Sequence, residues 1–385
     1  MHILSDMLPG ARFVVSTYMS YQLVTRDIER SLASVARQPM IARETEYFQA
    51  NIGKVTSVDE FVADRRLFNY AMKAAGLSDM AYAKAFMVKA LKEGVSEPDA
   101  FANKLTDKRY AEFVKTYNFA ARGAEAVNYA PARDETAAKY QIEGYNNGVD
   151  PLDPLLQAQV KYFKDNIGKV RSAEQFVAST DLFAIAMKAH GLADRLGDTA
   201  FMTKLLEEGV ADPDSLANRQ SDPKYAAFAS VFNFAERGAE ATTFRPAVEG
   251  AVANYMRQTL EENAGEQNEG VRLALYFQRK AGQITTPFQI LSDSALSQVV
   301  RTALGLPASI ASADIDRQAA LIKDRIDFAD FKDPAKLEKF LTRFTAMYEM
   351  ENGAPSTPNV ALLLQPSTRF GLSTDLLMTL QKLRG

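Results

Sequence analysis

The sequence predicts an all-α protein built from tandem copies of one helical unit. The segment 47–126 returns at 162–241, shifted by 115 residues without a gap, and about half of its positions are identical. A third, more divergent copy begins at Tyr276. No segment alternates apolar and polar residues as a half-buried strand does, whereas apolar residues recur at helical spacing in every copy.

The repeat predicts the domain organisation of the whole chain. Helical segments precede each copy, so we expect three helical units at 15–126, 131–241 and 246–350. An N-terminal extension occupies 1–14, and a linker rich in Gly and Pro followed by an amphipathic tail occupies 351–385. At 385 residues, three units of this size agree with the usual range of domain lengths.

The first expected helix covers 17–38. Val24, Ile28, Leu32 and Val35 follow one another at spacings of four, four and three, which places them on one helical face. Pro39 is expected to end or kink this helix.

Each copy then contains a helix start of the capping-box form, in which a hydroxyl residue is followed three positions later by Glu or Gln. The three pairs are Ser57 and Glu60, Ser172 and Gln175, and Thr286 and Gln289. The helical stretch that follows in copy one is either one helix or two short helices separated near Asp64.

Glycines mark the expected helix ends. Gly76, Gly191 and Gly305 each precede a leucine, which is typical of a Schellman motif with glycine in the left-handed conformation. Gly53 is expected to occupy a similar left-handed position after the preceding helix.

Aromatic residues at helical spacing are expected to fill the cores of the copies. Phe68 and Phe183 occupy equivalent positions and are predicted to be buried. The pairs Phe113/Tyr117 and Phe228/Phe232 are interpreted as core rather than as a stacking platform for nucleic-acid bases.

Composition restricts the classes of partner and the cellular compartment. The net charge is −3 with basic and acidic residues interleaved, which disfavours nucleic-acid binding. No segment is long and apolar enough for a membrane span, and the N-terminus lacks the pattern of a cleaved signal peptide. The absence of cysteine suits the cytoplasm, and it equally suits a protein exported unfolded through a narrow channel without a cleaved signal.

Motifs that would support catalysis, a cofactor or a metal are not found. Gly53-Lys54 lacks the glycine spacing and the following Ser or Thr of a phosphate loop, and Asp194–Asp198 departs from a calcium loop. Of two histidines, His190 replaces Ala75 of copy one and is interpreted as a helix-end residue. We therefore expect no enzyme, no cofactor and no metal; a carboxylate enzyme with its site between units is the least favoured alternative.

Three pairs of polar residues recur in the first two copies: Asn103/Asn218, Arg122/Arg237 and Glu125/Glu240. Arginine near a helix C-terminus complements the helix dipole, and asparagine stabilises turns. We interpret these residues as structural rather than as a recognition site, since the third copy does not keep them.

Seven segments carry a family resemblance: VVSTYMSYQLVTRDIERSL (14–32), NIGKV (51–55), LFNYAMKAAGL (67–77), FANKLTDKRYAEF (101–113), NEGVRLALYFQRKA (268–281), VVRTALGLP (299–307) and DFKDPAKLEKFLTRFTAMYEMENG (330–353). With these segments the sequence resembles an alphaproteobacterial family with a domain of unknown function that is commonly encoded among flagellar genes. The resemblance implies an all-helical fold and an association with the flagellum, and it supplies no catalytic residues.

Together these observations favour a non-enzymatic, flagellum-associated structural or assembly protein that acts through protein–protein contacts. The alternative is a cytoplasmic helical scaffold or export chaperone that holds a flagellar partner between helices. The candidate partner-binding residues are the leucines on one face of the C-terminal segment: Leu376, Leu377, Leu380 and Leu383. This face is expected to dock either on a partner or on the protein's own repeats.

Overall fold

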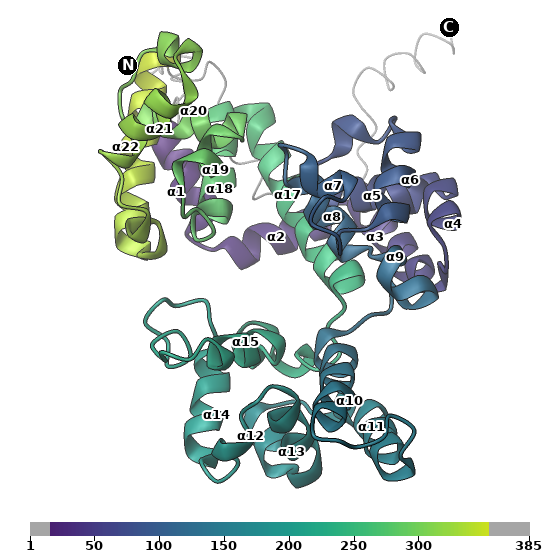
Figure 1. Ribbon diagram of the computed structural model, residues 1–385. Helices are drawn as coiled ribbons and strands as arrows, with labels where there is room; N and C mark the ends of the chain where they lie inside the picture. The colour runs from purple at the N-terminus through teal and green to yellow at the C-terminus, as the bar shows by residue number, and fades with distance from the viewer. Residues whose placement is uncertain (1–15, 354–385) are drawn as a thin grey trace, which may run out of the picture. The chain divides into compact units, whose positions relative to one another are not determined.

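The computed structural model describes residues 16–353, and helices are its regular elements throughout that range (Figure 1). No β-strand occurs in this part of the chain. The all-α class predicted from the repeat and from apolar spacing is therefore confirmed.

Contacts between residues divide the chain into two compact units, the first formed by 1–46, 256–328 and 335–385 and the second by 47–255 and 329–334. Among the described residues of the first unit, the helices are α1 (Thr17–Thr25), α2 (Ile28–Ala36), the first part of α3 (Pro39–Asn51), the second part of α17 (Ala251–Gln267), α18 (Glu269–Ala281), α19 (Pro287–Leu291), α20 (Ser294–Ala303), α21 (Ile315–Lys323) and α22 (Pro334–Asn352).

The second unit contains the first two copies of the repeat. Its helices are α4 (Val58–Ala63), α5 (Arg65–Ala74), α6 (Lys84–Glu93), α7 (Phe101–Lys104), α8 (Arg109–Thr116), α9 (Phe119–Arg122), α10 (Thr136–Asn146), α11 (Pro154–Asn166), α12 (Ala173–Ala178), α13 (Thr180–Ala189), α14 (Thr199–Glu208), α15 (Lys224–Val231) and α16 (Phe234–Arg237). The last residues of α3 and the first of α17 also belong to it.

These two compact units differ from the three consecutive units expected from the repeat. In copy two, the preceding helix α10 packs on α13, as expected. Tyr255 of α17 lies 115 residues after Tyr140 of α10, so the two tyrosines occupy equivalent positions in the sequence repeat. The ring of Tyr255 stacks on Tyr70 of α5, which belongs to copy one. A helix that follows copy two in sequence therefore packs on copy one, and this return of the chain explains why 246–255 group with the first two copies.

A five-residue π-helical turn precedes both α10 and α17, at Pro131–Glu135 and Pro246–Gly250. An acidic side chain closes each turn on the backbone: Asp134 accepts from the Ala130 amide at 2.9 Å, and Glu249 accepts from the Arg245 amide at 2.8 Å. π-Helical turns are rare, so their recurrence at the same repeat position shows that local backbone detail is copied along with the fold.

The three hydroxyl N-caps are confirmed, since Ser57, Ser172 and Thr286 each accept a hydrogen bond from the amide three residues later. The complete reciprocal box forms in the third copy, where Gln289 returns to the Thr286 amide at 3.0 Å. In the other copies the prediction needs correction, because the returning side chain accepts from the residue before the cap: Glu60 from Thr56 and Gln175 from Arg171.

Asp64 separates two helices, which resolves the alternative left open by the sequence. Its carboxylate caps α5 by accepting from the amides of Arg66 and Leu67, each at 3.0 Å, and it also accepts from the Tyr47 hydroxyl at 2.7 Å. The third copy repeats the arrangement with Tyr276 and Asp293, whose oxygens lie 2.5 Å apart. The cap thereby ties α5 and α20 to the helix that precedes each copy.

The Schellman ends are confirmed in all three copies. The amides of Leu77, Leu192 and Leu306 donate to carbonyls five residues earlier at 2.8, 2.8 and 2.9 Å, and the preceding glycines have φ angles of 69°, 68° and 63°. The prediction for Gly53 is wrong: it lies inside a 3-10 turn (Ile52–Lys54) without a positive φ. A side chain there would meet Asn128 instead, since an added Cβ would lie 3.2 Å from its Oδ1 atom.

The expected helix at 17–38 is two helices, because Asp27 caps α2 through the amide of Arg30 at 3.0 Å. Pro39 does not end a helix; it is the first residue of α3, where a missing amide proton costs nothing. Of the four apolar residues expected on one helical face, Val24 and Val35 are buried, at 3% and 2% exposure, whereas Ile28 and Leu32 are half-buried.

The aromatic rings of the core have nearly the same arrangement in the first two copies. Phe61 and Phe68 pack edge to face with centroids 5.8 Å apart, and their equivalents Phe176 and Phe183 do so at 5.7 Å. The predicted burial of Phe68 and Phe183 is confirmed, at 0% and 3% exposure. Such rings dominate the buried apolar area, so the same residues impose the same packing twice.

Two of the three recurring polar pairs, Asn103/Asn218 and Arg122/Arg237, make repeated contacts within their own copies, whereas the role of Glu125/Glu240 stays an interpretation. Asn103 donates to the carbonyls of Val95 and Glu97, and Asn218 repeats these bonds to Val210 and Asp212. The guanidinium carbons of Arg122 and Arg237 lie 3.5 and 4.0 Å from the ring centroids of Tyr129 and Phe244, respectively. No recognition site needs to be invoked for these four side chains.

Candidate interaction surface

The four leucines predicted to bind a partner lie outside the described residues, since the structure describes the chain to Gly353. Their role stays a prediction. In the described part of the chain, a contact site is indicated by several neighbouring apolar side chains that remain exposed after folding. A single exposed apolar side chain is common on any protein surface and indicates little.

The α10–α11 hairpin of the second unit carries the largest run of exposed apolar side chains along the described chain. They are Ile142 (58% exposed), Tyr145 (63%), Val149 (37%), Leu152 (82%) and Leu155 (67%). We call these five residues the hairpin surface. Ile142 and Tyr145 lie one helical turn apart on α10, Val149 and Leu152 lie in the connection, and Leu155 lies in the first turn of α11.

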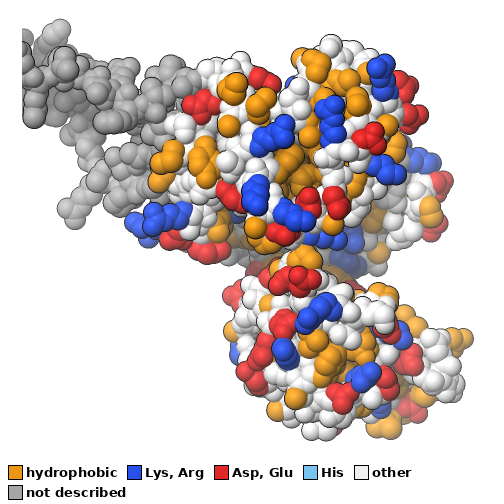
Figure 2. Space-filling view, turned by 90° about the vertical axis from the view of Figure 1, so that its left-hand side faces the viewer, with side chains coloured by type: hydrophobic (Ala, Val, Ile, Leu, Met, Phe, Trp, Pro, Cys, Tyr) orange, Lys and Arg blue, Asp and Glu red, His pale blue; other side chains and the backbone are white. Residues whose placement is uncertain are grey.

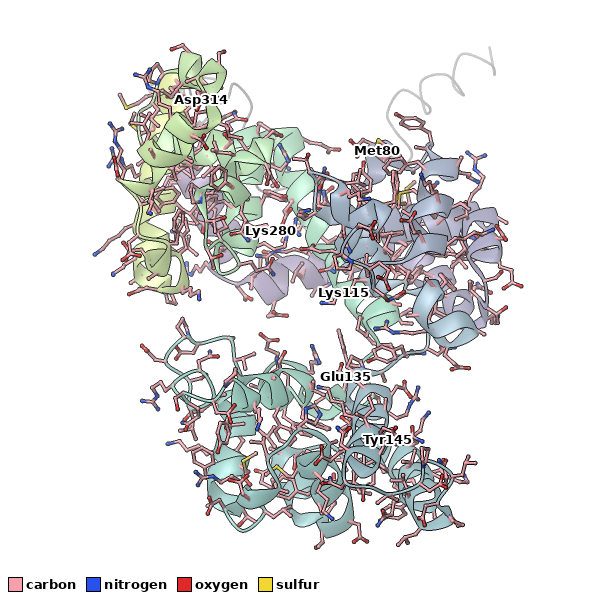
Figure 3. All side chains as sticks on the ribbon, viewed as in Figure 1. Met80, Lys115, Glu135, Tyr145, Lys280 and Asp314 are labelled. Atoms are coloured by element: carbon pink, nitrogen blue, oxygen red, sulfur yellow. The ribbon has the colours of Figure 1, made fainter. Side chains whose placement is uncertain are left out.

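Close packing of the two helices determines which residues remain outside. Gly144 faces α11, and an added Cβ would lie 3.2 Å from a methyl carbon of the buried Leu156. Farther along, the Tyr140 hydroxyl donates to Gln159 at 2.9 Å. Because Tyr140 and Gly144 occupy the inner face, helical geometry directs Ile142 and Tyr145 outward; Tyr145 is labelled in Figure 3.

The connection between α10 and α11 is held by its own hydrogen bonds. The amide of Val149 donates to the Gly144 carbonyl at 3.0 Å. The carboxylate of Asp150 accepts from the Leu152 amide, and that of Asp153 caps α11 through the Leu156 amide, each at 2.8 Å. Val149 and Leu152 therefore extend from a connection that is held by several hydrogen bonds of its own.

The charge of this hairpin is one-sided. Residues 140–160 contain three acidic residues, Glu143, Asp150 and Asp153, and no Lys or Arg. None of the three carboxylates pairs with a cation among the described residues. The nearest lysines in sequence are already paired, Lys139 with Glu135 at 2.8 Å and Lys161 with Asp165 at 2.6 Å. The hairpin surface is thus apolar with an uncompensated negative charge.

A comparison within the sequence is given by the positions 115 residues earlier, which hold Asp27, Arg30, Ser34, Arg37 and Met40, so four of the five apolar residues have polar counterparts. The segment 25–45 has four basic and three acidic residues, a net charge of +1, against −3 for 140–160. The comparison concerns sequence alone, because in the fold α17, and not α2, takes the place of α10 in copy one. The apolar residues of the hairpin surface are therefore not part of the repeated sequence pattern.

A second apolar depression lies in the first unit, between α19, α20 and α21. Its lining includes Leu291, Val300, Leu306, Ile310, Leu321 and Ile322, and its open volume is about 320 Å³, part of which is adjoining solvent. These side chains are buried or half-buried, so the depression offers less accessible apolar area than the hairpin surface.

The surroundings of His190 show that it is a packed core residue. His190 is 8% exposed, its Nε2 atom lies 3.2 Å from the Thr136 hydroxyl, and its ring packs edge to face on Phe228. Burial is the main reason that its pKa falls to about 4. The interpretation of His190 as a residue at a helix end is confirmed, because it directly follows α13.

A buried ion-pair cluster occupies the first unit. Glu261 is 1% exposed and receives two hydrogen bonds from Arg279, at 2.7 and 2.8 Å, while the Nε atom of Arg257 lies 3.8 Å away. All three residues come from neighbouring turns of α17 and α18, so the cluster links these helices.

Among residues 16–353, no group of His, Asp and Glu side chains is arranged to hold a metal ion. Over the same range, no helix combines the length and apolar character required to cross a membrane. On the face drawn in Figure 2, Lys and Arg side chains are interspersed with Asp and Glu side chains, in agreement with the interleaving predicted from the sequence.

The hairpin surface is not among the sites predicted from the sequence, because the repeat is clearest from residue 47 onward, after the equivalent segment of copy one. A signal is nevertheless present when 140–160 is aligned with 25–45, since four polar residues of the earlier segment are replaced by apolar ones in the later segment.

Comparisons with known proteins agree with the repeated architecture. A family model described as a protein of unknown function, DUF1217, matches residues 74–197 and again 189–337. A crystal structure of a protein from Agrobacterium tumefaciens is similar, with 36% sequence identity, a TM-score of 0.54, and coverage of 90% of this chain and 99% of that chain. No curated protein matches the sequence. The chain belongs to the DUF1217 family.

Proposed function

We propose that this protein acts by binding another protein and catalyses no reaction. The observation that supports the proposal is the hairpin surface, where five large apolar side chains are exposed on one helical hairpin. Leaving such side chains in water forgoes about 1.5–3 kcal/mol each relative to full burial, so a partner that covers them gains binding free energy.

We further propose that the partner belongs to the flagellum and that the protein serves in its structure or assembly. This part rests on the family resemblance, in which related sequences are commonly encoded among flagellar genes. A cytoplasmic scaffold or export chaperone is the second candidate, since a preformed helical surface is equally suited to holding an unassembled partner.

Photo-crosslinking in motile cells tests the proposal. Benzoylphenylalanine replaces Tyr145 in one strain and Tyr82 in another; Tyr82 is 81% exposed and lies outside the hairpin surface. We expect a discrete crosslinked product from position 145 and none from position 82. Equal labelling at both positions, or none at either, would contradict a contact role for this surface.

Fractionation of the same cells separates the two candidates. Crosslinked protein in sheared flagella or basal bodies supports the structural role, whereas crosslinked protein confined to the cytosol supports the scaffold or chaperone and excludes the structural role.

A further inference from the structure

We infer that the hairpin surface binds a basic amphipathic helix of a partner protein, one whose apolar stripe is flanked by Lys and Arg. The inference rests on the proposed contact role and adds the chemistry of the partner. It follows from the combination of exposed apolar side chains and uncompensated carboxylates on a single hairpin.

The apolar part of the surface has the spacing that suits a helix. Ile142 and Tyr145 occupy one face of α10, and Leu155 begins α11, which packs against α10 at Gly144 and Leu156. Because Ile142 and Tyr145 point away from the contact between α10 and α11, they form an outer apolar face. An amphipathic helix covers such a face with its own residues at i, i+3, i+4 and i+7. The first requirement of the partner is therefore an apolar helical stripe.

The charge determines the second requirement. Glu143, Asp150 and Asp153 have hydrogen bonds to amide groups of the hairpin, yet no described cation neutralises them. A partner that brought further carboxylates would be repelled, and one that brought Lys or Arg would gain both affinity and a faster encounter. The surface consequently selects a basic helix over an acidic helix.

The same charge argues against a second copy of this chain as the occupant. In a two-fold symmetric contact the same patch meets itself, so the three carboxylates of one hairpin would face the three of the other. Like charges brought together and shielded from water oppose association.

Binding of designed peptides to the full-length protein tests the inference. The probes are a helical 18-residue peptide of Leu and Lys with one apolar face, its Leu and Glu counterpart, and a Leu and Lys peptide of the same composition with the pattern scrambled. Fluorescence anisotropy gives the dissociation constants at low and at 0.5 M salt. We expect the amphipathic basic peptide to bind at least about tenfold more tightly than either control, and to weaken as salt screens the carboxylates.

Two variants locate the binding. Leu152→Arg introduces the residue of copy one and adds one positive charge, and Tyr82→Arg adds the same charge at an exposed position elsewhere. We expect Leu152→Arg to weaken the basic peptide at least about tenfold, because it removes apolar contact and charge attraction together, and Tyr82→Arg to weaken it far less. Both side chains are exposed, so both variants should keep the circular dichroism spectrum and the melting temperature of the wild type.

Three results would overturn the inference: equal or tighter binding of the acidic peptide, equal loss in both variants, or a self-association of the full chain that Leu152→Arg abolishes. Crosslinking from position 145 together with weak basic-peptide binding would refute the partner chemistry and leave the contact role standing. Absence of crosslinking at position 145 would refute the contact role itself, whatever the peptides show.

Discussion

Tyr70 of α5 and Tyr255 of α17 lie face to face, with ring centroids 3.8 Å apart and an angle of 6° between the ring planes. They are separated by 185 positions in sequence, yet both are almost fully buried, at 3% and 6% exposure. This pair shows how the helix that follows the second copy contributes to the core of the first.

The stack predicts that Tyr255→Ala destabilises the protein although Tyr255 lies far from copy one in sequence. Removal of a buried aromatic ring leaves a cavity and costs about 3–5 kcal/mol. Urea unfolding followed by circular dichroism measures the change, and Tyr82→Ala, at an exposed ring, should change stability by less than about 0.5 kcal/mol. Equal, small effects of the two substitutions would contradict the role of Tyr255 in the core.

His190 predicts a specific loss of stability on acidification. Its pKa is about 4 in the folded protein, mainly because of burial, while an unfolded chain has a histidine pKa near 6.5. The unfolded state therefore binds the extra proton first, so stability declines as the pH falls from about 6.5 towards 4. Between pH 7 and pH 5 the expected loss is about 2 kcal/mol.

The measurement is the difference between the wild type and His190→Ala, which carries the residue of copy one at this position. Carboxylates titrate in both proteins and cancel in the difference. We expect the pH dependence of unfolding free energy to be shallower in the variant; parallel curves would show that His190 is not kept neutral by the fold.

Gly209 is predicted to tolerate no side chain. Its φ of 65° and ψ of −147° form a conformation that is essentially restricted to glycine. An added Cβ would also lie 2.7 Å from the Cβ of Ala235. We expect Gly209→Ala to lower the melting temperature, with a cost on the order of 1–3 kcal/mol. Gly197→Ala is the matched control, because no atom lies within 4 Å of its added Cβ and its φ is not positive.

Glu261 is predicted to be essential to the stability of the first unit. Its carboxylate is buried, accepts two hydrogen bonds from Arg279 and lies beside Arg257. Glu261→Gln would leave these arginines without their counter-charge, at a cost of about 3–5 kcal/mol. Glu266→Gln, on the exposed side of the same helix, should have little effect on urea unfolding. If neither substitution changed the free energy of unfolding, the buried ion pair would make no net contribution to stability.

Local sequence patterns were sufficient to predict the fold class, the capped starts at Ser57, Ser172 and Thr286, and the Schellman ends, because each depends on residues a few positions apart. The return of Tyr255 to Tyr70 was not predictable in this way, since repeated sequence indicates equivalent environments and does not indicate which copy supplies each helix. The break at Asp27 was missed because apolar spacing continues through it.

The candidate site was the least predictable part. The expected leucines, Leu376, Leu377, Leu380 and Leu383, lie outside the described residues, and their role as docking residues stays a prediction. The hairpin surface has the same apolar residue types as a core, and its exposure depends on how α10 packs on α11 around Gly144. Composition alone does not distinguish an apolar residue that is buried from one that is left for a partner.

The most direct test of the contact role is quantitative co-purification of the full-length protein from cells that carry either Leu152→Arg or Tyr82→Arg at native expression. If the hairpin surface is where the protein meets its partner, Leu152→Arg reduces the co-purifying protein at least about tenfold and Tyr82→Arg leaves it near the wild-type amount. If both variants retain the same partner in the same amount, the hairpin surface is not the contact site and its proposed role in binding is wrong.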